Sequence, residues 1–404
     1  MIKVMTGNEA AAYGALCAKP EIICAYPITP QSRIPEQLSE FCAEGLLKGK
    51  FVNVESEMAA LGYVTGASQA GVRVFTATSS QGLAWMHEGL HWASGTRLPI
   101  VMANVNRPLG APWNLTCGQI DSLAQRDTGW MQYYCESNQE ILDTILQAYR
   151  VAESIYIPAM VCLDGVYLSY LSESVEVPEQ EKVDAYLPPY DPTRRAARGE
   201  RALKRHRNGP PPKGGYDPYN FTGNRYELHK LEMQCLDAAI KANEEFNAIF
   251  GREYPIVDTY KCDDAEVVIV MTGSAASTGR YVIDDLQERG YKVGLIKLRL
   301  FRPFPIDLVR KALSGRKKVA VFERDISPGQ CGIFYQEIKW ALYNNVPIYG
   351  FVGGLGGEDI TPQLIEKAIM YIIENDPPQQ EAIWLGLEEK GQSDDYDKHT
   401  VKVF

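Results

Sequence analysis

The chain has 404 residues and a formal net charge of −10 at pH 7, with 45% hydrophobic and 23% charged residues. That length suggests two or three domains of ordinary size, and the balance of residue types is that of a globular soluble protein. The negative charge argues against nucleic-acid binding, because phosphate backbones bind to basic faces. No apolar stretch reaches the roughly 18 residues of a membrane-spanning helix, and the N-terminus lacks the apolar core of a signal peptide.

The nine cysteines are scattered along the chain, and no two of them form a CxxC pair. The chain itself should therefore hold no iron–sulfur cluster and no zinc ribbon, because both are built from clustered cysteines. An odd count with apolar flanking residues predicts reduced, buried thiols in a cytoplasmic protein.

Strand-like apolar runs alternate with helical stretches across residues 1–190. The predicted strands are residues 21–26, 51–54, 72–78, 98–105, 131–134 and 158–164. Runs that are apolar throughout, separated by helices, predict an α/β fold in which a parallel sheet carries helices on both faces. In such sheets functional residues gather in the loops at the carboxyl ends of the strands, which here are residues 27–33, 55–57, 78–82 and 106–121.

A basic segment rich in Pro and Gly separates this block from a second one. Residues 191–260 are predicted to form a linker followed by a long helix. Seven basic residues lie between Arg194 and Arg207, and they either keep a strap between domains solvated or dock on an acidic partner subunit. Residues 261–360 again alternate strands and helices, which predicts a smaller parallel-sheet domain. Residues 361–404 are predicted to form a helix and a polar tail.

Two carboxylates, Glu55 and Glu57, stand at the start of a predicted apolar helix rich in small residues. One interpretation is helix capping, since a carboxylate at a helix N-terminus is favoured by about 0.3–1 kcal/mol. The other interpretation is functional, because a poorly hydrated carboxyl group is a candidate for a raised pKa and for proton exchange with a ring nitrogen. Thiamine diphosphate requires such a group at its aminopyrimidine ring, and Glu57 is the candidate.

Arg107 follows a predicted buried strand and precedes a loop rich in Pro and Gly. It is either an ordinary loop arginine or a fixed guanidinium that binds a substrate carboxylate through two hydrogen bonds. Thr29 is either part of a turn or the source of a hydroxyl for the same substrate. Residues 78–82 form either a Ser/Thr helix cap or a helix N-terminus that offers backbone N–H groups to a ligand.

No metal site is predicted in this chain. His87 and His91 share one face of a predicted helix, but two histidines alone make a weak site, and packing or pocket lining is the better interpretation. The glycine-rich stretches at 271–279 and 353–358 do not match a P-loop, and no G-x-G-x-x-G fingerprint opens the first strand–helix unit. Their absence disfavours a stand-alone NAD-dependent dehydrogenase.

A series of motifs, in order from about residue 7 to residue 358, resembles the alpha subunit of the 2-oxoacid:ferredoxin oxidoreductases, whose best-known member is pyruvate:ferredoxin oxidoreductase. The motifs are YPITPQS, VESEMAALGYVTGAS, TSSQGL, the Arg107 loop, QRDTGW, CLDG, LPPYDP, RLFRPFP and GGLGG. The resemblance implies that residues 1–190 form the pyrimidine-binding domain of a thiamine diphosphate enzyme. It also implies that residues 261–360 are similar to the transketolase C-terminal domain.

By the same resemblance, Glu57 contacts the aminopyrimidine of the cofactor, while Thr29 and Arg107 contact the carboxylate end of the substrate. These three are the expected catalytic residues. Further cofactor contacts are expected from Pro27, Ile28, Ser80, Gln81 and Gly82. The implied reaction is the oxidative decarboxylation of a 2-oxo acid to acyl-coenzyme A and CO₂, with coenzyme A as co-substrate and iron–sulfur clusters as electron acceptors.

The resemblance also implies a hetero-oligomer. In the family the diphosphate and Mg²⁺ bind on another subunit through a GDG motif, which this sequence lacks. The expected partners are a diphosphate-binding beta subunit, a gamma subunit and a ferredoxin-like delta subunit that carries iron–sulfur clusters. Either ferredoxin or an NAD-linked subunit then takes the electrons. A non-catalytic assembly subunit is the alternative of another class, and the retention of Glu57 argues against it.

The substrate pocket is expected to contain Thr29, Arg107, Trp113, Cys117 and Gln119. Pyruvate-type members of the family carry an acidic residue followed by His where this chain has TCGQIDS (116–122). Without the imidazole, and with Leu115 and Ile120 beside Trp113, the pocket is expected to be more apolar. An aromatic 2-oxo acid such as phenylglyoxylate is therefore expected ahead of pyruvate, which is the alternative.

Overall fold

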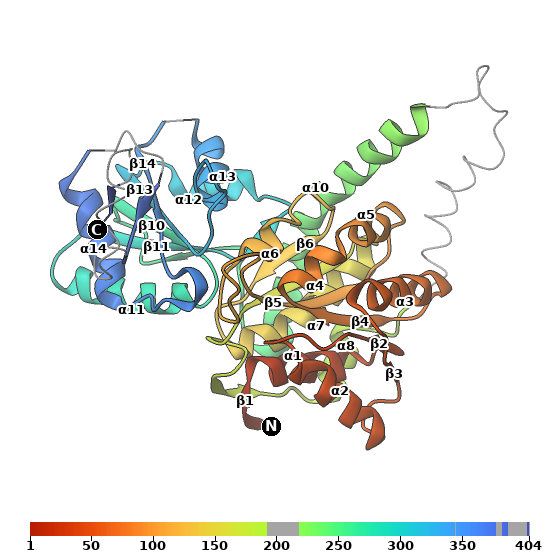
Figure 1. Ribbon diagram of the computed structural model, residues 1–404. Helices are drawn as coiled ribbons and strands as arrows, with labels where there is room; N and C mark the ends of the chain where they lie inside the picture. The colour runs from red at the N-terminus through yellow and green to blue at the C-terminus, as the bar shows by residue number, and fades with distance from the viewer. Residues whose placement is uncertain (192–217, 344, 377–381, 387–401, 404) are drawn as a thin grey trace.

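The computed structural model describes residues 1–191, 218–343, 345–376, 382–386 and 402–403. Two α/β domains, each built on a seven-stranded sheet, lie side by side in Figure 1. The predicted basic docking segment and most of the predicted polar tail lie outside the described residues. None of the described helices is long and apolar enough to cross a membrane.

The first sheet has the strand order β12–β6–β7–β5–β4–β2–β3. Its six parallel strands correspond to the six predicted ones: β2 (Ile22–Cys24), β3 (Lys50–Val52), β4 (Val74–Thr78), β5 (Val101–Asn106), β6 (Met131–Tyr134) and β7 (Ala159–Asp164). The central strands β4, β5 and β7 are buried along their whole length, because helices cover both faces. A separate antiparallel ribbon pairs β1 (Ile2–Thr6) with β8 (Ser172–Glu176).

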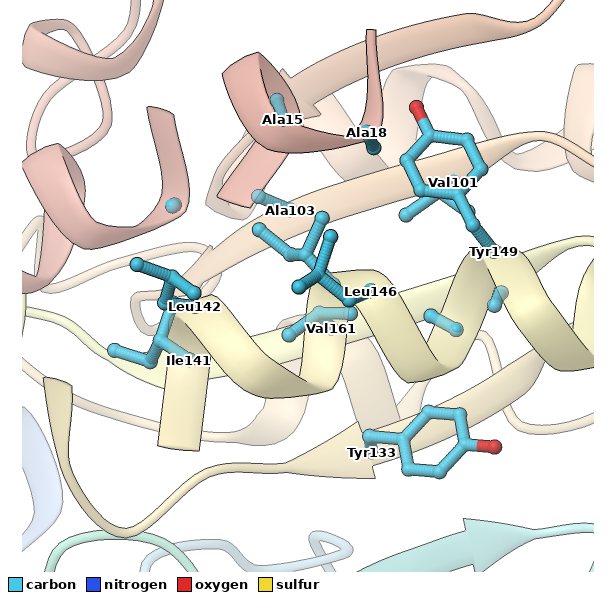
Figure 2. Packing of buried hydrophobic residues seen from close by; sticks show 14 of the residues in the cluster. Ala15, Ala18, Val101, Ala103, Tyr133, Ile141, Leu142, Leu146, Tyr149 and Val161 are labelled. Atoms are coloured by element: carbon cyan, nitrogen blue, oxygen red, sulfur yellow. The ribbon is translucent and has the colours of Figure 1, made fainter. Parts of the chain in front are cut away.

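One face of this sheet is covered by α1 (Gly7–Ala18), α2 (Arg33–Ala43), α7 (Asn138–Ile155), α8 (Gln180–Tyr186) and α10 (Pro218–Phe250). Leu142 and Leu146 of α7 are buried against Val101 and Val161 of the sheet (Figure 2). A Cβ added at Gly14 of α1 would lie 3.0 Å from the Leu142 carbonyl oxygen. The small residues of α1 therefore let this helix pack closely on α7.

The opposite face carries shorter helices, which surround the loops at the carboxyl ends of the strands. They are α3 (Glu57–Ala70), α4 (Ser80–Trp85), α5 (His87–Gly95) and α6 (Ile120–Leu123). All nine cysteines of the chain are free and eight of them are buried, which agrees with the predicted buried thiols.

The second sheet has the order β16–β15–β14–β13–β10–β11–β9, and every pair in it is parallel except β11 with β9. Its strands are β9 (Val257–Tyr260), β10 (Val267–Met271), β11 (Val293–Leu298), β13 (Lys318–Glu323), β14 (Ile348–Val352), β15 (Ile383–Trp384) and β16 (Lys402–Val403). The helices of this domain are α11 (Ala275–Glu288), α12 (Ile306–Leu313), α13 (Ile333–Leu342) and α14 (Pro362–Glu374), with a short 3-10 helix η1 (Leu355–Gly357).

The division into sheets differs from the boundaries set out from the sequence at 260/261 and 360/361. β9 precedes residue 261, and β15 and β16 follow residue 360, yet all three pair within the second sheet. β12 (Leu300–Arg302), in the middle of the second block, instead pairs antiparallel with β6 at the edge of the first sheet. The pattern of apolar residues predicts where strands occur, but it does not predict which strands pair at the edges of a sheet. This accounts for the differences.

The two domains share one apolar core. Phe301 of β12 and Tyr134 of β6 both contact Phe334 of α13 edge-on, with ring centroids 4.7 Å and 5.5 Å apart respectively. All three rings are almost fully buried. Buried apolar residues of both domains thus form one continuous cluster at their contact.

A buried ionic network reinforces this contact. Glu140 of α7 accepts hydrogen bonds from Lys297 of β11 at 2.5 Å and from Arg299 at 2.8 Å. Lys297 also pairs with Glu136 at 3.0 Å. The side chains of Glu140, Lys297 and Arg299 are each at most 5% exposed, so no water compensates for a missing partner.

Replacing Glu140 with glutamine is expected to destabilise the chain by about 3–5 kcal/mol, because two buried cations lose their shared carboxylate. The shift of the urea unfolding midpoint measures the effect. Asp184→Asn is the matched control: its pair with Lys19 is half-exposed on both sides, and its loss is expected to cost less than about 1 kcal/mol. Equal shifts for the two variants would contradict the assignment.

Candidate functional site

The predicted site residues lie in loops that follow four neighbouring strands. β3, β2, β4 and β5 stand next to one another and run parallel, so their carboxyl ends meet at one edge of the sheet. Thr29 follows β2, Glu57 follows β3, Gln81 follows β4 and Arg107 follows β5. The topology therefore brings to one place residues that are up to 78 positions apart in the chain.

Glu57 is the first residue of α3, and the helix is capped by its neighbour. The side chain of Ser56 accepts the Ala59 N–H at 3.1 Å, so the side-chain cap comes from Ser56, although both glutamates were candidates for it. Glu57 is only 5% exposed, whereas Glu55 is exposed. The Glu57 carboxylate makes no hydrogen bond to any other described residue, which leaves it available to a ligand.

Gly82 of α4 faces this carboxylate. A Cβ at position 82 would lie 2.7 Å from the Glu57 side chain, at both Cγ and Oε1. Only glycine fits there without moving the glutamate. A buried carboxyl group without a protein partner, beside a helix start that excludes side chains, suits a flat heterocycle with a ring nitrogen. The residues therefore fit the aminopyrimidine of thiamine diphosphate.

Arg107 is held by two acceptors from different loops. Its Nη1 donates to the carbonyl oxygen of Thr29 at 2.5 Å, and its Nη2 donates to Oε1 of Gln81 at 2.5 Å. The side chain is 3% exposed, and its Nε has no hydrogen-bond partner. Burial lowers the pKa of Arg107, and the nearby charge of Asp121 opposes that shift. The planar guanidinium is thus fixed in orientation before any ligand arrives.

The turn after β4 supplies Gln81. Ser80 has a φ of +50°, in the left-handed region, and its Oγ lies 2.6 Å from both Gln81 Oε1 and the Pro108 carbonyl oxygen. The predicted cofactor-bordering segment 78–82 and the Arg107 loop are therefore bonded to each other.

Two side-chain amides that were not predicted from the sequence hold the loop that carries Thr29. Gln31 is fully buried, donates to the Ala77 carbonyl at 2.9 Å and accepts the Ile28 N–H at 3.2 Å. Asn8 donates to the Pro30 carbonyl at 2.8 Å. Thr29 itself is exposed, as is Pro27, and Ile28 is half-buried. Thr29 touches Arg107 through its carbonyl.

Two of the predicted pocket residues lie elsewhere. Cys117 is fully buried beside Arg324, whose Nη1 is 3.3 Å from its sulfur. Gln119 is hydrogen-bonded to Asp164 at 3.1 Å and to Thr272 at 3.2 Å. Both side chains thus fill the contact between the domains, whereas the sequence placed them in the substrate pocket. Their loop packs against the second domain, a tertiary contact that the local sequence does not reveal.

Of the remaining predicted residues, Trp113 is exposed beside Arg107, whereas His87 and His91 contact each other. Trp113 is 69% exposed, and its ring lies 5.7 Å from the Arg107 guanidinium carbon. His87 contacts Gln125 through Nδ1 at 2.6 Å, and the His91 ring lies edge-on at 5.0 Å. Within the part of the chain that the structure describes, no group of three His, Cys, Asp or Glu side chains is placed to hold a metal ion.

The sequence matches two family models. Residues 13–243 match the model for pyruvate flavodoxin/ferredoxin oxidoreductase, thiamine diP-binding, and residues 265–365 match pyruvate:ferredoxin oxidoreductase core domain II. The pyruvate synthase subunit PorA of Methanothermobacter thermautotrophicus is 45% identical over 395 residues, which cover 97% of this chain and 100% of PorA. This chain belongs to the 2-oxoacid:ferredoxin oxidoreductase family. Within that family it is an alpha subunit, as the motifs had suggested.

Other members of the family support the same assignment. The ketoisovalerate oxidoreductase subunit VorA of Pyrococcus horikoshii is 42% identical over 392 residues, which cover 95% of this chain and 98% of VorA. A solved 2-oxoglutarate:ferredoxin oxidoreductase from Magnetococcus marinus superposes with a TM-score of 0.67 at 20% identity, covering 91% of this chain and 65% of that one. At that identity the likeness shows the fold, and the predicted fold class is confirmed. The chain is an oxidoreductase subunit.

Proposed function

We propose that this subunit activates thiamine diphosphate through Glu57 and binds the carboxylate of a 2-oxo acid through Arg107 and Thr29. The enzyme would oxidatively decarboxylate the acid to acyl-coenzyme A and CO₂. The observation that carries the proposal is the buried, unpartnered carboxylate of Glu57, which faces Gly82, next in sequence to the Gln81 that orients the Arg107 guanidinium. This chemistry needs two groups from a protein: a carboxyl group that exchanges a proton with the cofactor, and a guanidinium that binds the substrate carboxylate.

Each residue has a separate task. When bound, thiamine diphosphate supplies a carbon nucleophile and an electron sink for the 2-oxo carbon. Glu57 holds a proton at the ring nitrogen of the aminopyrimidine. Arg107, fixed by Gln81 and the Thr29 carbonyl, orients the substrate carboxylate, and Thr29 also offers its exposed hydroxyl to the substrate. Gly82 keeps the space beside Glu57 clear of side chains.

We propose a small aliphatic 2-oxo acid, with pyruvate first, as the substrate. The preference for an aromatic acid such as phenylglyoxylate depended on an apolar pocket made partly by Cys117 and Gln119. Those side chains are buried between the domains, and Trp113 is mostly exposed, so this support is lost. The sequence relatives PorA and VorA are named for pyruvate and ketoisovalerate, both aliphatic.

A substrate panel tests this choice. The assembled complex is supplied with coenzyme A and a viologen dye, and the rate of dye reduction is compared among pyruvate, ketoisovalerate and phenylglyoxylate. We expect the highest kcat/KM with an aliphatic acid. A higher kcat/KM with phenylglyoxylate would overturn the substrate assignment and leave the reaction class in place.

We propose that partner subunits complete the enzyme. A beta subunit would bind the diphosphate and Mg²⁺, and gamma and ferredoxin-like delta subunits would carry the electrons through iron–sulfur clusters to ferredoxin or an NAD-linked acceptor. Co-purification of this chain with iron-containing subunits and thiamine diphosphate is the expected result. Complexes that form but reduce no dye with any 2-oxo acid would favour the alternative, a non-catalytic assembly subunit.

A further inference from the structure

We propose that Asp121 is a positioning residue for this site, and that its ionised carboxylate holds the Arg107 loop and the Ser80–Gln81 turn together in the arrangement that binds substrate. The inference rests on the proposed function, because it concerns how the same site binds its 2-oxo acid. Asp121 lies on α6, is fully buried, and forms an ion pair with no described residue. A buried charge of this kind needs a full set of hydrogen bonds.

One carboxylate oxygen joins the two loops. Oδ2 of Asp121 accepts the backbone N–H of Ser80 at 2.9 Å, the backbone N–H of Arg107 at 3.2 Å and the side-chain amide of Asn104 at 3.2 Å. Ser80 adopts a left-handed conformation that is strained for a non-glycine residue. The hydrogen bond from the Ser80 N–H stabilises this turn. The turn orients the Gln81 side chain toward the Arg107 guanidinium.

The other oxygen anchors the carboxylate to its own helix and to β5. Oδ1 accepts the Asn106 side-chain amide at 2.7 Å and the Ser122 backbone N–H at 2.8 Å. Asn106 also donates to the Ser122 hydroxyl at 2.7 Å. Asp121 therefore accepts five N–H groups, and the same carboxylate holds the backbone of Arg107 and that of Ser80, the residue before Gln81.

The donor set requires the ionised form. Every described group that is hydrogen-bonded to the Asp121 carboxylate is an N–H donor. A proton on either oxygen, or the amide N–H₂ of an asparagine, would face an N–H and find no acceptor. Asparagine is thus not a conservative replacement here, although it has the same shape.

Few charges compete for this carboxylate. The groups that face it electrostatically are the Arg107 guanidinium, Tyr134 on β6 and Cys162 on β7. Burial raises the pKa of both Tyr134 and Cys162, so both are neutral near pH 7. Burial also raises the pKa of Asp121 to about 6, against the effect of its N–H donors. Substrate binding is therefore expected to persist above that pH and to weaken as the pH falls through it.

The test uses the assembled complex and oxamate, an unreactive 2-oxo acid analogue. Calorimetry gives the Kd of oxamate from pH 5 to pH 8, and steady-state kinetics give KM and kcat. Asp121→Asn is expected to raise both the oxamate Kd and KM at pH 7.5 by at least about tenfold and to remove the pH dependence near 6. Asp143→Asn is the matched control, because Asp143 is equally buried but lies on α7, bonded to Arg252. It is expected to lower the unfolding midpoint and leave oxamate binding unchanged.

A second variant keeps the proposal testable if Asp121→Asn fails to assemble. Asn106→Leu removes one donor to Oδ1, which is expected to move the midpoint of the pH profile upward by about one unit. Wild-type oxamate affinity and an unchanged pH profile in Asp121→Asn, or an unmoved midpoint in Asn106→Leu, would overturn the inference. If the wild-type complex turns over no 2-oxo acid, the proposed function fails instead.

Discussion

Replacing Glu57 with glutamine is expected to abolish turnover of the 2-oxo acid by the assembled complex. Glutamine has the same shape and hydrogen-bonding reach, but its amide cannot exchange a proton with the aminopyrimidine nitrogen. Loss of a positioned acid–base group costs about 10²–10⁴-fold in rate, so at most about 1% of the wild-type kcat should remain. Viologen reduction at saturating coenzyme A and thiamine diphosphate measures it, with complex assembly checked by gel filtration.

Glu55→Gln is the control for this experiment. Glu55 lies two residues away but is exposed, and its replacement is expected to leave kcat within about twofold of the wild type. The comparison separates the effect of losing the buried Glu57 carboxyl group from the effect of losing any negative charge at the start of α3. A Glu57→Gln complex that assembles and turns over near the wild-type rate would remove Glu57 from the catalytic assignment.

Replacing Arg107 with lysine is expected to raise KM for the 2-oxo acid about 100-fold and to change kcat less. The guanidinium is a planar fork that bonds Thr29 and Gln81 at once, and a single ammonium group cannot reproduce that geometry. Charge-assisted hydrogen bonds to a substrate carboxylate are worth about 1.5–3 kcal/mol, which corresponds to the expected loss in kcat/KM. Initial rates over a range of substrate concentrations separate KM from kcat.

Arg33→Lys is the matched control. Arg33 starts α2, four residues after Thr29, and its guanidinium bonds Gln37 and Glu40 on the surface. Its replacement is expected to leave KM unchanged within error. If the Arg107→Lys and Arg33→Lys complexes have the same KM as the wild type, Arg107 does not bind the substrate carboxylate.

The six parallel strands were predictable because each is a short apolar run that ends at a polar loop. A strand that is buried on both faces is apolar at successive positions, and this gives the run. Thr29, Glu57, Gln81 and Arg107 were predictable as a group for the same reason, since polar residues at the ends of neighbouring strands meet at one edge. In the structure Arg107 contacts both Thr29 and Gln81, and Glu57 faces Gly82, the residue after Gln81.

The parts that could not be predicted depend on contacts between distant segments. Cys117 and Gln119 lie in a loop that contributes residues both to the site and to the contact between the domains. The local sequence does not show which residues belong to which. Asp121 has its partners on β5 and after β4, so its role follows from tertiary structure. The pair of asparagines at 104 and 106, in a strand where every residue is buried, was the one available signal.

β12 has a consequence for how this subunit can be handled. Three residues of the later block complete the edge of the earlier sheet, and without them β6 would present an open row of backbone N–H and C=O groups to other chains. A fragment cut near residue 260 would therefore carry Glu57 and Arg107 on a sheet prone to self-association. We therefore expect the first domain to need the later block for its closed sheet edge, so variants of Glu57 and Arg107 are best studied in the whole chain.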